Sequence, residues 1–378
     1  MPIREVYIDT DVYTEAKKRI KKVILGFDTI IVSFSGGKDS LVVLKLVEEV
    51  YKELGIKEKV NVAFNDEELI PDYVVNFVQD IYKSGRYNFR YYCYPLESNK
   101  FVLGDTKMYI QWDPNRRWLR QPPEFALRPE PGDTRIYSQY TMDGVMAQGY
   151  KGRIANLLGI RAEESLMRRN SCKTKLNENY ICSSSEPRVS VVKPIYDWSE
   201  KDVFLYFYKN NITYCPLYDA QMWAGDRLRV STPLHSQNAK NFDRLKITCP
   251  VFYQQVVDLF PEMKLNERYY KQMYAQRDDV IAKYPKTFEG VLAFCYDTYD
   301  DPVIRAKMEK ALRSAWHTRQ QKMKTERGRE ILGGYPLRYL FRAVMIGEYK
   351  NGLTPQHKGR LSQKDIDFEK GLDLDNAE

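Results

Sequence analysis

The sequence predicts an α/β protein with a parallel twisted sheet, flanking helices, an irregular insertion and a C-terminal helical extension. The first observation behind this prediction is residues 29–34, "TIIVSF", a β-branched run typical of a strand buried on both faces. The second is that such runs alternate with helical patterns at short spacing as far as residue 96. This alternation is typical of parallel strands joined by helical crossovers.

Each element follows from its local pattern. Apolar spacing and β-branched runs predict helices at 11–26, 38–52 and 72–83, and strands at 29–34, 59–66 and 88–96. Residues 154–160 are expected to form a strand or a passage from helix to strand. A further strand, turn and helix are predicted in "SVVKPIYDWSEKDVFLYFYKNN". In that stretch Ser199 is expected at the N-cap and Asp202 at N3, an approximate capping box.

The same pattern gives the domain organisation. We expect an N-terminal helical segment at 1–27 and a sheet domain at 28–245. Tryptophan, proline, arginine and glycine dominate residues 98–152, which predicts an irregular insertion or a lid inside that domain. Residues 246–378 form the expected helical region, with a solvated tail beyond Gly359.

Composition narrows the class of protein. The chain has 378 residues, 43% of them hydrophobic, which is ordinary for a globular protein. It has no apolar run of about 18 residues and no leader-like start, so we expect a cytoplasmic protein without a membrane contact. The net charge of +8 fits an anionic ligand, nucleotide or nucleic acid, but it is also common among proteins that bind neither.

Cysteine and histidine usage argues against metal clusters. None of the six cysteines forms a C-x-x-C pair, so reduced and mostly buried thiols are expected, without an iron–sulfur cluster. The three histidines form no H-E-x-x-H motif, which gives little support for a transition-metal site. The cysteines are Cys93, Cys172, Cys182, Cys215, Cys249 and Cys295.

The string "SGGKDS", residues 35–40, follows the first predicted strand and opens a helix. A glycine turn at a helix N-terminus directs backbone N–H groups toward a bound anion. The string is not a Walker A loop, because Gly37-Lys38 is followed by Asp39 where that loop has serine or threonine, and the first glycine of the loop is absent. It is not a Rossmann fingerprint either, because the G-x-G-x-x-G spacing is absent. A plain tight turn is the alternative interpretation.

The string resembles the PP-loop of the adenine nucleotide alpha hydrolase superfamily, which includes N-type ATP pyrophosphatases and phosphoadenosine phosphosulfate (PAPS) reductases. "LLGIRAEESLMRR" and "VKPIYDWSEKDV" resemble later segments of that family, and Asp66 stands where the family has an acid after its second strand. The match covers roughly residues 28–235 and implies a HUP-like fold. "YYCYPLESN", "QWDPNRRWLRQPP" and "AGDRLRVSTPL" also resemble a subgroup typified by immunoglobulin-binding regulator A, whose members are often encoded beside ParB-like proteins.

The resemblance implies a set of site residues. The residues expected to bind ATP or PAPS are Ser33, Ser35, Gly36, Gly37, Lys38, Asp39, Ser40, Asp66, Gly159 and Arg161. The catalytic candidates are Lys38, Asp39, Arg161 and Arg168. The lysine and the two arginines are included because developing negative charge on phosphate oxygens needs nearby cations. Asp39 and Asp66 could hold Mg²⁺ or orient Lys38 and the ribose. The alternatives are a helix-dipole role for Asp39 and an ion-paired surface for the two arginines.

Two segments remain open. The first segment holds aromatic and arginine side chains that could stack on a nucleotide or clamp it: Trp112, Trp118, Arg116, Arg117 and Arg120. The alternative is a loop that packs on its own aromatic side chains. Residues 302–329 hold nine Lys/Arg and two Asp/Glu, which indicates a solvated helix face or a nonspecific surface for nucleic acid phosphates.

The chain lacks the E-C-G-x-H segment with which PAPS reductases reduce sulfate. We therefore expect an enzyme that binds ATP or a PAPS-like nucleotide and performs nucleotidyl or sulfuryl-group chemistry on an acceptor that the sequence does not name. No redox step would use its own cysteines. The alternative is a non-catalytic nucleotide-binding regulator that acts with a ParB-like partner.

Overall fold

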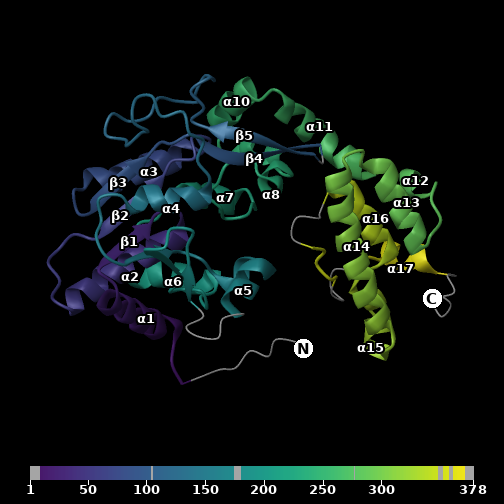
Figure 1. Cartoon of the computed structure of the whole chain (residues 1–378), viewed down its shortest axis with the longest axis horizontal. Coiled ribbons are helices and arrows are strands. Elements are labelled where there is room, and N and C mark those ends of the chain that lie inside the picture. Colours follow the sequence, from purple (N-terminus) through teal and green to yellow (C-terminus); the bar gives the residue numbers. More distant parts are fainter. Residues whose placement is uncertain are drawn as a thin grey trace. The chain divides into compact units, whose positions relative to one another are not determined.

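A computed structural model describes residues 9–103, 105–173, 180–275, 277–347, 352–356 and 361–370. The chain divides into two compact units (Figure 1). The first unit comprises Met1–Lys100 and Met108–Met263, and the second comprises Phe101–Lys107 and Lys264–Glu378. The first unit thus includes the N-terminal helix and extends past residue 245, where the sheet domain was expected to end.

A six-stranded sheet forms the centre of the first unit. Its order is β3-β2-β1-β6-β8-β7, with β1 in the interior of the sheet as its apolar sequence predicted. All neighbours are parallel except β7 and β8, which are antiparallel. The strands are β1 (Thr29–Ser33), β2 (Asn61–Asn65), β3 (Asn88–Tyr92), β6 (Ile154–Leu158), β7 (Ile181–Ser183) and β8 (Val189–Val192).

The helices of the first unit confirm the predicted alternation. α2 packs against β1 and β6 and also against α1 and α6. The expected capping box at Ser199 is present, because its side chain accepts from Asp202 N–H and the Asp202 side chain accepts in return. The helices are α1 (Val12–Gly26), α2 (Lys38–Glu53), α3 (Asp72–Lys83), α4 (Gln139–Ala147), α5 (Leu166–Lys173), α6 (Glu200–Lys209), α7 (Leu217–Trp223), α8 (Ser236–Ala239), α9 (Leu245–Thr248) and α10 (Pro250–Leu259).

The insertion at 98–152 is more regular than expected. It contains most of the hairpin β4 (Leu96–Val102) and β5 (Asp105–Gln111), and also α4. α4 buries Met142, Val145 and Met146 against apolar residues of the sheet, including Ile31 and Ile154. The segment between the hairpin and α4 is irregular, because the prolines that contributed to the prediction are concentrated there.

The second unit is helical, as predicted for the C-terminal region. α11 (Glu262–Ala275) leads into it, and the buried core includes Val291 of α13, Leu312 of α14 and Phe341 of α16. The short 3₁₀ turn η3 (Leu332–Gly334) precedes α16. The remaining elements are α12 (Arg277–Ile281), α13 (Phe288–Thr298), α14 (Pro302–Met323), α15 (Glu326–Arg329), α16 (Leu337–Ile346) and α17 (Gln363–Glu369).

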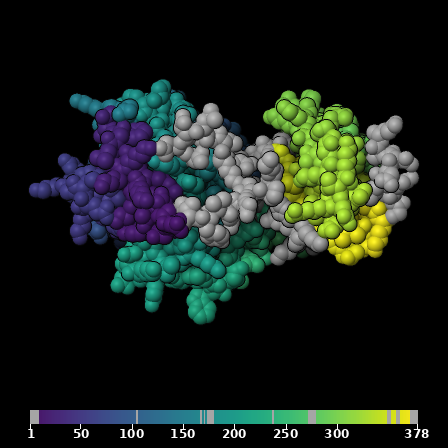
Figure 2. All heavy atoms as spheres, turned by 90° about the horizontal axis from the view of Figure 1, so that it is seen from below, coloured from purple at the N-terminus to yellow at the C-terminus, as the bar shows by residue number. Residues whose placement is uncertain are grey.

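The expectation of a solvated tail beyond Gly359 is wrong for α17. Glu369 is buried and accepts hydrogen bonds from Arg319 Nη2 at 2.6 Å and from Leu337 N at 2.5 Å. Arg319 belongs to the basic segment 302–329, most of which lies at the surface of the second unit (light green in Figure 2). Its side chain, however, is 3% exposed, so Arg319 is a core residue and not a surface cation. Within the described residues no helix has the length and apolar character needed to cross a membrane.

Candidate functional site

The glycine turn between β1 and α2 requires glycine at its first position. Gly36 has a φ of +74°, and a Cβ there would lie 2.7 Å from Val74 Cγ1 of α3. Gly37 is the N-cap residue of α2 and, as a glycine, has no side chain of its own to cap the helix. A β-carbon on Gly37 would lie 2.8 Å from Val230 Cγ2. The turn is therefore held tightly between α3 on one side and residues near 230 on the other.

Two of the three predicted serines shape this turn. Ser40 Oγ accepts from Ser35 N at 3.1 Å and donates to Gly37 O at 3.0 Å. The Ser35 and Ser40 hydroxyls are 3.0 Å apart. Ser33 instead donates to Asn156 Oδ1 of β6 at 2.7 Å, so its hydroxyl links two strands. Ser35 and Ser40 thus fix the conformation in which the N-terminus of α2 begins.

A buried ion network joins the turn to the loop after β6. Asp39 Oδ1 accepts from Arg161 Nε at 2.6 Å, and Asp39 Oδ2 lies 3.3 Å from Lys38 Nζ. Lys38 and Arg161 are each only 3% exposed. Glu200 Oε1, at the start of α6, lies 3.3 Å from Lys38 Nζ. The structure therefore brings Lys38, Asp39 and Arg161 together, with both Asp39 oxygens bound to cations.

Gly159, which was expected to contact the nucleotide, packs against the turn. A Cβ on Gly159 would lie 2.4 Å from both the Asp39 carbonyl carbon and the Ser40 nitrogen. This glycine allows the loop after β6 to approach the first turn of α2, which brings Arg161 within reach of Asp39.

Residues 226–232, here named the covering segment, lie over the glycine turn. Leu228 O accepts from Lys38 Nζ at 3.1 Å, and Val230 lies beside Gly37. Tyr218 OH, from α7 just before this segment, accepts from Lys38 N–H at 2.9 Å. One of the N–H donors that an anion at this turn would use is therefore bound to a protein hydroxyl. These contacts join residues about 180 positions apart, which is why the sequence patterns did not predict them.

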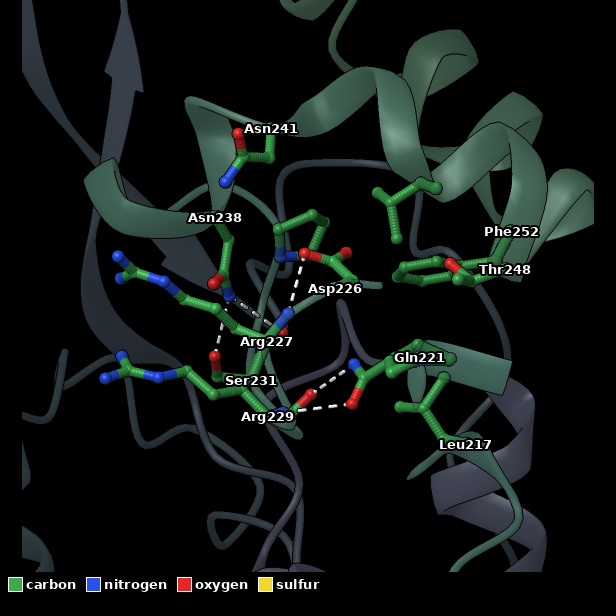
Figure 3. Close-up of a pocket in the computed structure, with 13 residues that line it drawn as sticks. Leu217, Gln221, Asp226, Arg227, Arg229, Ser231, Asn238, Asn241, Thr248 and Phe252 are labelled. Atoms are coloured by element: carbon green, nitrogen blue, oxygen red, sulfur yellow. Dashed lines mark hydrogen bonds between the residues drawn. The ribbon is translucent and has the colours of Figure 1, made fainter. Parts of the chain in front are cut away.

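The backbone of the covering segment is fixed by a buried side chain. Gln221 accepts from Arg229 N at 3.0 Å and donates to Arg229 O at 2.7 Å. Figure 3 shows these two bonds at the edge of a cavity of about 50 Å³. The apolar lining of that cavity includes Leu217 and Phe252.

Arg168 lies among other arginines. It is hydrogen-bonded to Glu164 and is partly exposed. Burial and the nearby positive charges of Arg229 and Arg161 lower the pKa of Arg168, and the charge of Asp39 opposes that shift. Burial and the charge of Arg227 likewise lower the pKa of Arg229. Positive charge therefore gathers beside the turn, on both the α5 side and the covering segment.

Asp66 belongs to a different network. Asp66 Oδ1 accepts from Arg120 Nη2 at 2.5 Å and from Glu68 N at 2.8 Å, and its Oδ2 accepts from Tyr91 OH at 2.5 Å. Burial, followed by the charge of Asp66, raises the pKa of Tyr91. Asp66 therefore anchors the insertion to the end of β2.

A magnesium site made by Asp39 and Asp66 does not fit this arrangement. The oxygens of both carboxylates already accept from protein donors, which leaves them poorly placed to replace water on a Mg²⁺ ion. Among the described residues no group of three or more His, Cys, Asp or Glu forms a metal centre.

The sequence prediction missed Glu68. It has a φ of +61° and is fully buried. Its carboxylate accepts from Arg116 at 2.6 and 2.9 Å, from Trp112 N at 2.7 Å and from Leu119 N at 3.0 Å. The acidic run after β2 was the available signal, but it did not distinguish the three acids.

The aromatic part of the insertion is held by these acids. Trp112 Nε1 donates to Asp66 O at 2.7 Å, and the rings of Trp112 and Trp118 pack edge to face with centroids 5.6 Å apart. Arg116 and Arg120 are bound to Glu68 and Asp66, whereas Arg117 is exposed. The alternative of a loop packed on its own aromatics matches this geometry, and stacking on a nucleotide base stays a prediction.

Comparisons with known proteins support the resemblance. The chain is 28% identical over 246 residues to the uncharacterized protein YbdN of Escherichia coli (strain K12), which covers 61% of this chain and 59% of that protein. The chain therefore spans about three fifths of the length of this relative.

Solved structures are similar only at low identity. FMN adenylyltransferase of Candida glabrata, in complex with FAD and inorganic pyrophosphate, is 14% identical, with 57% of this chain and 64% of that chain covered and a TM-score of 0.37. PAPS reductase from Candida auris, as a phosphate complex, is 12% identical, with 54% and 84% covered and a TM-score of 0.31.

The family comparison covers the loop after β6 and the covering segment. Residues 145–256 match the phosphoadenosine phosphosulfate reductase domain. This span includes Gly159, Arg161, Arg168, Tyr218 and Arg229, and it begins after the glycine turn itself. The narrower resemblance to the immunoglobulin-binding regulator A subgroup stays a prediction from the sequence. The chain therefore contains a stretch similar to the phosphoadenosine phosphosulfate reductase domain, within a mostly parallel α/β fold that is followed by a helical C-terminal region.

Proposed function

We propose that this protein binds ATP or a PAPS-like adenine nucleotide at Ser35–Ser40 and transfers its nucleotidyl or sulfuryl group to an acceptor. The observation that carries this proposal is the junction of β1 and α2. A glycine turn precedes the N-terminus of α2, whose N-cap residue Gly37 has no side chain, and two buried cations, Lys38 and Arg161, meet at Asp39 beside it. Helix N-termini of this kind attract phosphate through their free N–H groups and dipole.

The chemistry would follow from charge placement. With ATP, an acceptor atom would attack the α-phosphorus, the bond to the bridging oxygen would break, and pyrophosphate would leave with that electron pair. With PAPS, the acceptor would attack the sulfur, and adenosine 3′,5′-bisphosphate would leave with the electron pair of the broken S–O bond. Negative charge grows on the phosphate oxygens during this step, so fixed cations stabilise the transition state more than the ground state. Lys38 and Arg161 are the residues that we assign to this role. Arg168 would neutralise the outer part of the phosphate chain.

Four of the six thiols support a reaction that does not use them as nucleophiles. Burial raises the pKa of Cys215 and of Cys295 to about 11, and it also raises the pKa of Cys93 and of Cys249. A thiol with a raised pKa holds little of the nucleophilic thiolate at neutral pH. We therefore expect no sulfite from PAPS when thioredoxin is the only reductant supplied.

One observation favours the alternative of a non-catalytic nucleotide-binding regulator that acts with a ParB-like partner. Asp39, the acid closest to the glycine turn in the described structure, is held between two cations and is poorly placed to serve as a general base. Nucleotide binding without turnover would then be the whole activity.

Turnover separates the two proposals. The full chain would be incubated with radiolabelled ATP or PAPS, and free AMP, pyrophosphate, adenosine 3′,5′-bisphosphate and sulfite would be measured. Lys38→Gln and Arg161→Gln should lower nucleotide affinity and turnover, whereas Lys59→Gln, on a surface loop before β2, should not. Affinity that is unchanged in the folded Lys38→Gln variant would exclude the turn as the site. Binding without any product would favour the regulator.

The test uses Lys38 because Gly37 is unsuitable. A side chain at Gly37 would meet Val230 and Tyr218 as well as any phosphate. Loss of binding in a Gly37→Val variant would therefore not distinguish a blocked phosphate site from a displaced covering segment.

A further inference from the structure

A second group of polar side chains lies where the covering segment meets the loop after β2 and the hairpin β4–β5. Thr232 N donates to Glu67 Oε2 at 3.2 Å, and Thr232 Oγ1 lies 3.4 Å from Tyr109 OH. Burial raises the pKa of Tyr109, and hydrogen bonds with the side chains of Ser98 and Gln111 oppose that shift. These five residues, all in the first unit, are here named the polar cluster.

Within the described part of the chain, two side-chain oxygens of the polar cluster have no hydrogen-bond donor. Gln111 is 2% exposed, and its Oε1 is buried without a partner. Glu67 is half-buried, and among the described residues its carboxylate accepts a hydrogen bond only through Oε2. A buried acceptor that has lost water and gained no donor is unfavourable. A ligand with an O–H or N–H group would supply the missing donor.

Glu67 differs from the other acids near the glycine turn because no cation neutralises it. Asp66 and Glu68, on either side of it, are each paired with an arginine, and Asp39 is held between two cations. Burial raises the pKa of Glu67, the hydrogen bond from Thr232 N–H opposes that shift, and the charge of Asp66 adds to it. Of these four carboxylates, Glu67 is therefore the best suited to accept a proton.

The polar cluster lies next to the glycine turn. β1 and β2 are parallel neighbours, so the turn that follows β1 and Glu67, which follows β2, lie at the same end of the sheet. Ligands of open α/β sheets bind at this carboxyl end. Thr232 is two positions from Val230, which lies beside Gly37, and two residues span at most about 7 Å. A phosphate at the turn and the carboxylate bound to Thr232 are therefore separated by about the length of one small molecule.

We propose that the polar cluster is the subsite for the acceptor, that the acceptor carries a hydroxyl or amino group, and that Glu67 is the general base. This inference rests on the proposed function, because the acceptor attacks the nucleotide held at the glycine turn. The O–H or N–H of the acceptor donates to Glu67 Oε1. Gln111 Oε1 accepts a second hydrogen bond from the same molecule.

The proton leaves the acceptor as the new bond forms. With ATP, the lone pair of the acceptor atom forms a bond to the α-phosphorus while Glu67 Oε1 takes the proton. The bond to the bridging oxygen breaks, and pyrophosphate leaves with that electron pair. With PAPS, the same proton transfer accompanies attack on the sulfur, and adenosine 3′,5′-bisphosphate leaves. Glu67 then releases the proton to solvent.

The test measures product release from ATP and from PAPS by the full chain, with water or hydroxylamine as the surrogate acceptor. Hydroxylamine is the stronger nucleophile and depends less on removal of its proton during the attack. The variants are Glu67→Gln, Glu67→Asp and Gln111→Leu. Glu97→Gln is the control, because Glu97 is an exposed acid on β4, next to Ser98. Calorimetry without an acceptor gives the nucleotide affinity, and thermal unfolding shows that each variant is folded.

Glu67→Gln should lower kcat at least about 100-fold with water and less than about tenfold with hydroxylamine, because loss of a general base affects the weaker nucleophile more. Its KM for the nucleotide should stay within about threefold of the wild type. Glu67→Asp should retain more activity than Glu67→Gln, since it keeps a carboxylate. Gln111→Leu should raise the KM for hydroxylamine about three- to tenfold through the loss of one hydrogen bond. Glu97→Gln should match the wild type throughout.

Equal losses with water and hydroxylamine in Glu67→Gln would overturn the assignment of the base, and so would an unchanged kcat in the folded variant. Failure of the proposed function gives a different result. If the wild type binds no adenine nucleotide, both proposals are wrong. If it binds the nucleotide but releases no product with either surrogate, binding at the turn stands, whereas group transfer and the general base are both wrong.

Discussion

Gly159 lies directly against Asp39, so that the loop after β6 touches the first turn of α2 with no room for a side chain. A β-carbon on Gly159 would be 2.4 Å from the Asp39 carbonyl carbon and 2.7 Å from its oxygen. Backbone atoms of a helix terminus move less readily than a flexible side chain. The contact therefore determines how closely Arg161 approaches the glycine turn.

We expect Gly159→Ala to lower the free energy of unfolding by about 1–3 kcal/mol, because the added methyl overpacks a backbone contact. The same change should weaken nucleotide binding by displacing Arg161. Denaturant unfolding and calorimetry measure the two effects. Gly26→Ala is the matched control, since a Cβ there meets nothing within 4 Å. If both variants behave alike, the contact is not what constrains residue 159.

Tyr218→Phe should change stability and affinity in opposite directions. Tyr218 OH accepts from Lys38 N–H at 2.9 Å, so its loss leaves that donor unpaired until an anion binds. We expect the free energy of unfolding to fall by about 0.5–1.5 kcal/mol and pyrophosphate affinity to rise about three- to tenfold. Chemical denaturation and calorimetry provide the two measurements.

Tyr214→Phe serves as the control for this prediction, because its hydroxyl bonds to Asp219 at 2.9 Å on the exposed side of the same region. Pyrophosphate affinity that falls in Tyr218→Phe would mean that the hydroxyl contacts the anion and does not compete with it.

The buried pair of Arg319 and Glu369 should dominate the stability of the second unit. Removing one member leaves the other charge buried, which typically costs about 3–5 kcal/mol. We expect Arg319→Met to expose α16 and α17 to hydrogen exchange, as measured by mass spectrometry on the full chain. Arg319→Met combined with Glu369→Leu should recover part of the protection.

An exposed ion pair on the same helix provides the control. Arg313 pairs with Glu309 one turn away, at 2.7 Å. Arg313→Met should change the free energy of unfolding by no more than about 0.5 kcal/mol. Exchange rates in α17 that are equal for Arg319→Met and Arg313→Met would contradict the role assigned to the buried pair.

His235 should make the protein less stable in acid. Burial lowers the pKa of His235 below its ordinary value of 6.5, and its Nε2 lies 3.3 Å from Ser98 Oγ. Below pH 6.5 the unfolded chain therefore binds more protons at this residue than the folded chain does. Stability contributed by the neutral imidazole is present above pH 6.5 and is lost as the pH falls through that value.

The measurement is the free energy of unfolding between pH 5 and pH 7.5. The decrease toward acid should be smaller in His235→Gln than in the wild type, whereas His317→Gln, at an exposed position of α14, should follow the wild type. Parallel curves for wild type and His235→Gln would show that the buried imidazole does not titrate in this range.

Sequence patterns alone determined the elements whose cause is local. The β-branched run at 29–34 predicted the interior strand β1, and apolar spacing predicted α3 with the bounds that the structure gives it. The capping box at Ser199 and the glycine turn before α2 also depend on residues within a few positions of each other. Backbone conformation and hydrogen bonding over such short distances follow directly from residue type.

Only the tertiary structure decided which charged groups meet. The sequence placed Asp39 and Asp66 together as metal ligands, whereas folding pairs Asp39 with Arg161 and Asp66 with Arg120. Arg319, predicted at the surface, became buried because Glu369 folds back onto it from a tail expected to be solvated. A carboxylate binds whichever cation lies within a few ångströms, and residues separated by 50 to 180 positions come within that distance only after the chain has packed.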